Sequence, residues 1–128
     1  MQGKPIGWFE IYVQDMARAR AFYEAVFECT LDSPGNPDQQ QDMEMWSFPG
    51  AMDAGNGASG ALVRMEGVNP GAGGIIVYFM CEDCAEEAAR AAASGGHVVR
   101  EKFDLGEYGF AALVNDTEGN LIGLHSMR

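Results

Sequence analysis

Two ionisable side chains stand on strand-like segments at opposite ends of the chain and are the first candidates for chemistry. Glu10 lies in the β-prone run WFEIYV, and His125 lies in the run LIGLHS. Because side chains alternate along a strand, Glu10 shares a face with Trp8 and Tyr12. A carboxylate there can accept hydrogen bonds or act as a base, and an imidazole can switch its donor role near neutral pH. Both are candidate catalytic residues, although an arginine partner for Glu10 and a purely structural place in the wall for His125 are the more ordinary explanations.

Aromatic side chains form a second group of candidates. A cavity lined by aromatic rings suits a planar or apolar ligand, and phenol oxygens can fix the orientation of that ligand. The same rings can also simply fill a concave sheet. The expected ligand-binding residues are Trp8, Glu10, Tyr12, Trp46, Tyr78 and His125.

The three cysteines allow a redox or metal site but favour neither. Their odd number and irregular spacing argue against a disulfide framework. Cys81 and Cys84 form a C-x-x-C pair, and a helix start would favour a thiolate at Cys84. Glu82 and Asp83 stand between them, however, and their negative charge opposes thiolate formation. Only Cys29 and two histidines remain to complete a zinc site, so we interpret the cysteines as structural.

The elements that must position these residues repeat along the chain. The segment WFEIYVQDMARARAFYE begins at Trp8, and IVYFMCEDCAEEAARAA begins at Ile76, 68 residues later. Each is a β-prone run followed by an acidic residue and an alanine-rich helical pattern. Asp15 and Asp83 take the same place in the two copies, where each is a good N-cap. This pattern is typical of a duplicated supersecondary unit.

The two halves of the chain are predicted to be modules of one domain, 1–128. We expect helices over 17–27 and from Asp83 to Ser94, with Gly95 ending the second. The expected strands cover 6–13, 29–33, 43–48 and 60–65 in module one, and 75–81, 97–103, 108–115 and 121–126 in module two. Module one spans about 4–66 and module two about 74–127. Half of a 128-residue chain buries too little surface to stand alone, so the modules should pair in an α+β fold.

Composition narrows the function classes. The formal net charge of −11 disfavours nucleic acid and anionic membranes as partners, because both require clustered lysine and arginine. No apolar run approaches the ~20 residues that span a bilayer. The start of the sequence, MQGKPIGWFE, lacks a signal-peptide pattern. We therefore expect a cytoplasmic protein that binds neither nucleic acid nor membrane.

Two segments resemble a known superfamily. WFEIYVQDMARARAFYEAVF and the closing DTEGNLIGLHS are similar to the vicinal oxygen chelate superfamily, which includes glyoxalase I, extradiol dioxygenases and bleomycin-resistance proteins. The resemblance covers essentially the whole chain. It implies two βαβββ modules whose mixed sheets curl around a central cavity. It also implies a homodimer, since many members form one.

The resemblance carries the metal-ligand positions of that superfamily onto unsuitable residues. Metalloenzymes of the group take ligands from four strands, and three of those positions fall on Trp8, Ile76 and Gly123. The strand expected at 60–65 offers no oxygen or imidazole ligand in either register. Tryptophan and isoleucine cannot coordinate a divalent cation, and glycine has no side chain to do so. We expect no cofactor and no ancestral metal site, and a displaced divalent metal held by the two candidate catalytic residues stays open.

Two function classes follow from these residues. The first is a small-molecule-binding protein, similar to the bleomycin-resistance branch, that holds a ligand without chemistry. The alternative is a glyoxalase-like lyase or dioxygenase-type enzyme that uses a displaced metal or acid–base site. The missing metal ligands favour the first class, and the polar residues Glu10 and His125 keep the second open.

Overall fold

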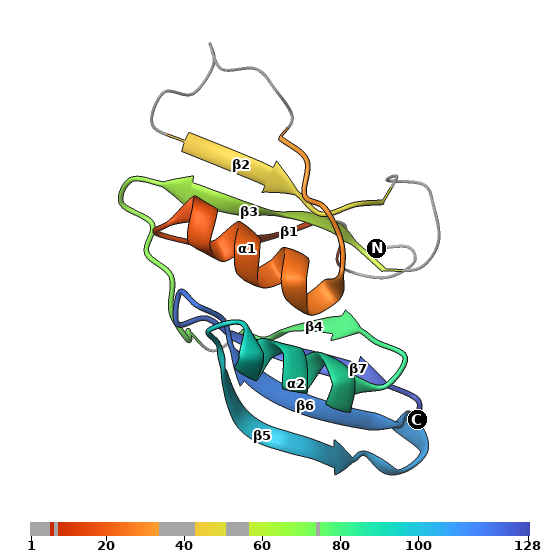
Figure 1. Cartoon of the computed structure of the whole chain (residues 1–128). Helices are drawn as coiled ribbons and strands as arrows, with labels where there is room; N and C mark the ends of the chain where they lie inside the picture. The colour runs from red at the N-terminus through yellow and green to blue at the C-terminus, as the bar shows by residue number, and fades with distance from the viewer. Residues whose placement is uncertain (1–5, 7, 34–42, 51–56, 74) are drawn as a thin grey trace.

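The computed structural model describes residues 6, 8–33, 43–50, 57–73 and 75–128. Two sheets lie edge to edge, and each is covered by one helix on the same side of the molecule (Figure 1). Module one contains β1 (Trp8–Tyr12), α1 (Met16–Phe27), β2 (Met43–Ser47) and β3 (Ser59–Met65). Module two contains β4 (Val77–Met80), α2 (Cys84–Ala93), β5 (His97–Asp104), the 3-10 turn η1 (Gly106–Tyr108), β6 (Phe110–Asn115) and β7 (Leu121–Ser126).

Both helices begin at the predicted aspartates. The Asp15 carboxylate accepts a hydrogen bond from the Arg18 amide at 3.1 Å, and the Asp83 carboxylate accepts one from the Ala85 amide at 3.1 Å. Each bond satisfies one of the amide groups that a helix start leaves unpaired. At the other end of α2, Gly95 has a φ of 92°, a conformation that glycine adopts without strain.

The strand order follows the same plan in the two modules, with three strands in the first sheet and four in the second. In module one the order is β1-β3-β2, and in module two it is β4-β7-β6-β5. The first strand of each module runs parallel to the last strand of the same module, and the remaining pairs are antiparallel. The predicted α+β fold of paired modules with mixed sheets is confirmed, and the sheets stay open rather than closing into a barrel.

Two predicted strands differ from those observed. The strand expected at 29–33 is a single bridge, in which Asp32 exchanges both backbone bonds with Ser47. The preceding residues instead end helix α1, because Glu28 takes a left-handed conformation with a φ of 52°. The strand expected from 108 begins at Phe110, because Gly106–Tyr108 form a 3-10 turn.

The face of each sheet toward the helices packs into a core that both modules share. Ile11 and Val13 are buried, and the Phe9 ring meets the Phe79 ring of module two edge-on at 6.0 Å. Phe79 also stacks on Phe27 of α1, with ring centroids 4.4 Å apart. Residues from both copies therefore exclude water together, as the small size of each module requires.

The opposite side of the two sheets, which we call the open face, carries the alternate residues. Trp8 is 41% exposed and Tyr78 is 49% exposed, whereas their neighbours along the strands are covered. The predicted alternation of β1 and β4 is thus confirmed. Within the described part of the chain, no helix is long and apolar enough to cross a membrane.

Candidate functional site

A groove of about 830 Å³ lies between β1 and β4. Among the described residues, β1 pairs with β3 alone and β4 with β7 alone, and the other edges of these two strands border the same space (Figure 1). The side chains that line the groove are mainly aromatic and aliphatic. The aromatic ones are Trp8, Phe9, Phe27, Phe48, Tyr78 and Phe79. Such a lining suits the apolar body of a small molecule.

Glu10 is the acidic residue of the groove on the open face. Its carboxylate accepts a hydrogen bond from the Trp8 indole nitrogen at 3.2 Å and one from the Tyr12 hydroxyl at 2.7 Å. The hydrogen bond to Glu10 raises the pKa of the Tyr12 phenol, and partial burial and the charge of Glu10 raise it further. The phenol therefore stays protonated as a donor, and the two aromatic neighbours hold the carboxylate in place.

The described lining of the groove is acidic. It contains two carboxylates, Glu10 and Glu87, and no lysine or arginine. Among the described residues, no ion pair involves Glu10. The expected alternative, a structural arginine partner for Glu10, is absent from that part of the chain. A carboxylate that receives only neutral donors favours a cationic partner.

Glu87 comes from α2 and was not among the predicted site residues. Its side chain is 13% exposed, and one carboxylate oxygen, Oε1, is buried without a hydrogen-bond partner among the described residues. The other oxygen lies 3.4 Å from the Arg90 guanidinium. The helical spacing of α2 could have predicted that Glu87 faces the interior. Glu87 stands three residues after the buried Cys84, so both share one face of the helix.

The four positions that the resemblance assigns to metal ligands do not fit a metal. Tyr78 lies opposite Gly123, and a Cβ at Gly123 would overlap the Tyr78 ring. The equivalent pairing in module one sets Glu10 opposite Ala61, which resolves the register of that strand. The ligand positions are thus Trp8, Ala61, Ile76 and Gly123, and none has a donor atom suited to a divalent cation. In the described residues, no three His, Cys, Asp or Glu side chains gather as metal ligands would.

His125 lies on the open face but outside the groove lining. It pairs with Met80 across β4 and β7, and its Nε2 atom is 2.6 Å from the Tyr108 carbonyl oxygen. Because a carbonyl only accepts, Nε2 carries the hydrogen and Nδ1 is the acceptor when the ring is neutral. No described contact joins His125 to Glu10, so their joint catalytic role stays a prediction.

Trp46 is on the other side of its sheet. It lies opposite Leu62, whose side chain faces the helices, and the Arg20 guanidinium covers its ring at 3.5 Å. Its indole nitrogen donates to Glu44 at 3.1 Å. Of the six expected ligand-binding residues, Trp8, Glu10 and Tyr78 therefore line the groove, and Tyr12 joins them through Glu10. His125 and Trp46 stand apart.

The C-x-x-C pair has the properties of packing residues. Burial raises the pKa of the Cys81 thiol to about 12, and the nearby Glu87 charge adds to this effect. The Cys81 thiol donates to the Phe79 carbonyl at 3.6 Å, and Cys84 is fully buried. Because the thiolate is the reactive form, this environment supports the structural interpretation.

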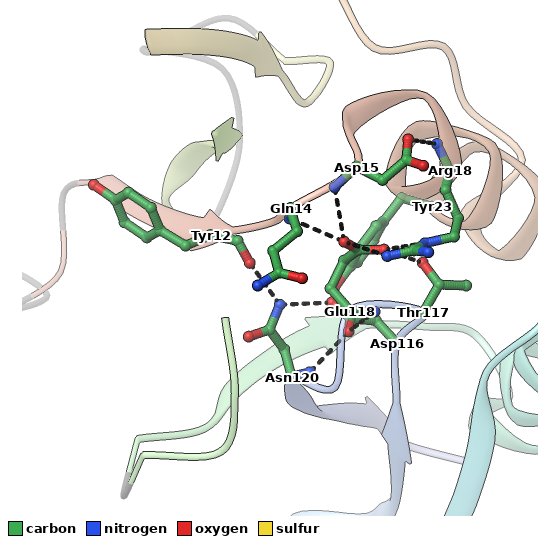
Figure 2. A network of polar contacts seen from close by, with 9 residues as sticks. All are labelled: Tyr12, Gln14, Asp15, Arg18, Tyr23, Asp116, Thr117, Glu118 and Asn120. Carbon is green, nitrogen blue, oxygen red and sulfur yellow. Dashed lines mark hydrogen bonds and ion pairs between the residues drawn. The ribbon is translucent and has the colours of Figure 1, made fainter. Parts of the chain in front are cut away.

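The DTEGN turn, residues 116–120 of module two, forms a polar network with residues 12–23 of module one (Figure 2). We call this network the module junction. Asp116 accepts hydrogen bonds from the amides of Glu118 and Asn120, both at 2.8 Å, and from the buried Tyr23 hydroxyl at 2.7 Å. The Asn120 side chain donates to the Tyr12 carbonyl at 2.9 Å, while the Tyr12 ring points away from the network. The turn of module two thus holds the strand of module one that carries Glu10.

Comparisons with known proteins agree with this architecture. The family model described as the Glyoxalase/Bleomycin resistance protein/Dioxygenase superfamily matches residues 5–124. The protein named "Putative glyoxylase CFP32" of Mycobacterium bovis is 30% identical over 118 residues, which are 91% of this chain and 42% of that protein. Its counterpart in Mycobacterium tuberculosis matches equally. The chain spans less than half the length of these relatives.

Solved structures show the same fold at lower identity. Glyoxalase I from Zea mays has a TM-score of 0.71 and 20% identity, over 96% of this chain and 46% of that one. A glyoxalase/bleomycin resistance protein from Albidiferax ferrireducens has a TM-score of 0.65 and 17% identity, over 96% of this chain and 98% of that one. In both comparisons the matched region includes the two modules, so the similarity is one of overall fold.

Proposed function

This chain belongs to the glyoxalase/bleomycin resistance protein/dioxygenase superfamily, and on that premise we propose that it is a small-molecule-binding protein. The ligand lies in the groove between β1 and β4. The observation that carries this proposal is the combination of an aromatic lining with the held carboxylate of Glu10. Ligand pockets commonly combine a largely apolar wall with a few oriented polar groups.

The residues at the metal-ligand positions favour binding over metal-dependent chemistry. Tyr78 fills the space above Gly123, which is one of the positions that the resemblance assigns to metal ligands. At the first-strand ligand position of module one, Trp8 presents an indole nitrogen that only donates. Both rings give the ligand contact area and neither can hold a cation by coordination.

A fluorescence screen tests the proposal. With Trp46 replaced by phenylalanine, Trp8 is the single tryptophan, and a fragment that enters the groove should change its emission. Because Trp8→Ala removes this reporter, the affinity of that variant is measured by calorimetry, and it should be weaker by about 1–3 kcal/mol, as for a buried aromatic anchor. The Trp46→Phe protein serves as the reference, since Trp46 is on the other face. Fragments whose affinity is indifferent to both Trp8 and Tyr78 would place the site elsewhere and contradict the proposal.

The catalytic alternative keeps Glu10 and His125 as acid–base residues or as ligands of a displaced metal. It requires the two side chains to act on one molecule, and they come from different modules. Metal analysis of protein purified without chelator tests it. Stoichiometric zinc, nickel, manganese or iron that is lost in both Glu10→Gln and His125→Gln would establish a displaced site.

We also propose that the protein is a homodimer. Large apolar side chains are exposed near the groove, among them Ile75 at 82% and Met80 at 70%. A second copy would cover such residues, and symmetric pairing is the commonest oligomer. Light scattering at micromolar concentration should give twice the mass of 13.8 kDa, and the mass of a monomer would refute the proposal.

A further inference from the structure

The molecule contains two tryptophan–glutamate pairs with the same spacing. Trp46 donates its indole hydrogen to Glu44 at 3.1 Å, and Trp8 donates its indole hydrogen to Glu10 at 3.2 Å. In each pair the two residues are separated by one position, so they share one face of a strand. The pairs lie on opposite faces of the same sheet.

The pair on the helix face already has its cations. The Arg64 guanidinium lies 3.5 Å from Glu44, and the Arg20 guanidinium lies 3.5 Å from the centroid of the Trp46 ring. A cation over an indole face is attracted by the negative face of the ring, and a cation beside a carboxylate is attracted by its charge. The protein itself therefore satisfies both halves of this pair.

The pair on the open face has no cation within the described residues. No ion pair there reaches Glu10, and no lysine or arginine covers Trp8. Several of the basic side chains serve other partners, as Arg18 does with Glu118 and Lys102 with Asp83. The hydrogen bonds that Glu10 receives come from the neutral donors of Trp8 and Tyr12, which leave its charge uncompensated.

We propose that the groove selects organic cations: an ammonium or guanidinium head beside Glu10 and Trp8, with an apolar body between the edges of β1 and β4. This inference rests on the proposed function and specifies its ligand class. The buried carboxylate of Glu87 adds a second negative charge to the groove, and the described lining has no positive one. An anionic ligand would meet uncompensated repulsion from Glu10, whereas the charge of Glu87 is partly offset by Arg90 at 3.4 Å.

Three probes with one body and different heads test the charge. They are 4-phenylbutylamine, which is a cation at pH 7, the neutral 4-phenylbutan-1-ol, and the anion 4-phenylbutyrate. Binding is followed by the two indole N–H signals in nitrogen-15 NMR spectra, because Trp8 and Trp46 are the two tryptophans of the chain. The amine should bind at least about tenfold more tightly than the alcohol, and the butyrate weakest of all. The amine should shift the Trp8 signal and leave that of Trp46 in place.

Two matched variants test the role of Glu10. Glu10→Gln keeps the size of the side chain, removes its charge, and should weaken amine binding about tenfold while alcohol binding changes less than twofold. Glu44→Gln makes the same change in the other pair and should leave both affinities unchanged. Urea midpoints of the two variants check that each remains folded.

The outcomes separate the two proposals. If the alcohol binds as tightly as the amine at the Trp8 signal, the cation inference is wrong and the small-molecule groove stands. If the preference for the amine survives in Glu10→Gln, the head lies elsewhere and the assignment of Glu10 is wrong. If none of the three probes shifts the Trp8 signal at millimolar concentration, both the groove and its charge preference are refuted.

Discussion

The module junction and the groove each contain a glutamate held by neighbouring donors, and the two differ in where their charge is balanced. At the junction, the Glu118 side chain is fully buried and lies 2.7 Å from the Arg18 guanidinium (Figure 2). It also accepts bonds from the amides of Gln14 and Asp15, at 2.9 and 3.0 Å. In the groove, Glu10 is exposed, and the donors that reach it from the described residues are neutral side chains of its own strand.

The difference indicates separate roles for the two glutamates. The buried carboxylate of Glu118 has its charge balanced by an arginine and its oxygens hydrogen-bonded by backbone amides. These interactions therefore stabilise the contact between the two modules. A carboxylate without a cation contributes little to folding and can interact strongly with a molecule that brings the charge. We therefore expect changes at Glu118 to act on stability and changes at Glu10 to act on binding.

The largest expected effect is at the junction. Glu118→Gln should lower the free energy of unfolding by about 2–3 kcal/mol at pH 7. It removes the negative charge that pairs with Arg18 and accepts hydrogen bonds from two backbone amides. Urea denaturation measures the change. Glu10→Gln is the matched control and should alter stability by less than about 0.5 kcal/mol. Equal losses of stability in the two variants would contradict the separate roles assigned to Glu118 and Glu10.

Acid should act on the junction through the same residue. Burial alone would raise the Glu118 pKa, but the hydrogen bonds from Arg18, Asp15 and Gln14 outweigh it and lower the pKa to about 2. A lowered pKa in the folded state stabilises the protein above the ordinary glutamate pKa, and this stability is lost as the pH falls toward 2. We expect a loss of about 2 kcal/mol between pH 5 and pH 2, since Arg18 is half exposed and solvent screens it.

The urea midpoint followed from pH 5 to pH 2 measures this loss. In Glu118→Gln the decline should be visibly shallower, because the group that gains a proton is gone. A decline of the same steepness in both proteins would assign the acid sensitivity to other carboxylates.

The contact between Gly123 and the Tyr78 ring is expected to show an intermediate effect. Gly123→Ala should cost about 1–2 kcal/mol of stability, because the new methyl group overlaps the Tyr78 ring. Combining it with Tyr78→Ala should recover about 1 kcal/mol of that loss, as expected for two residues in direct contact. Additive losses in the double variant would mean that the ring moves aside without strain.

The smallest expected effect concerns the phenol that holds Glu10. Tyr12→Phe removes the 2.7 Å hydrogen bond at a partly exposed site, so unfolding should change by less than about 0.5 kcal/mol. Binding of 4-phenylbutylamine should weaken about twofold, since the carboxylate loses one orienting contact. The same NMR titration measures it, and an improved affinity would show that Tyr12 competes with the ligand for Glu10.

The local features of the fold follow from short stretches of sequence. Asp15 and Asp83 begin the helices because their carboxylates bond to nearby amides, which depends on residues two or three positions away. The open-face position of Trp8 and Glu10 follows from alternation with Phe9 and Ile11, whose apolar side chains identify the buried face. These predictions were correct because the information is local.

The face of Trp46 could not be predicted in the same way. The run MEMWSF places methionines on one face and Glu44 and Trp46 on the other, and neither set is clearly the more apolar. The face on which Trp46 lies is determined by the register of β2 against β3, which sets Trp46 opposite Leu62. Likewise, the strand expected at 29–33 is reduced to the bridge between Asp32 and Ser47, because its only pairing in the described structure is with a residue of β2.

Amino-acid order alone thus specifies the caps, the alternation and the duplicated unit, since each depends on neighbours within a few residues. The packing of distant segments decides the rest. It brings Glu87 of α2 to the groove, places Glu118 against Arg18 a hundred residues away, and leaves Glu10 without a cation in the described structure. Charge balance at a site depends on which side chains the whole fold brings together, and that arrangement has no signature in a single segment.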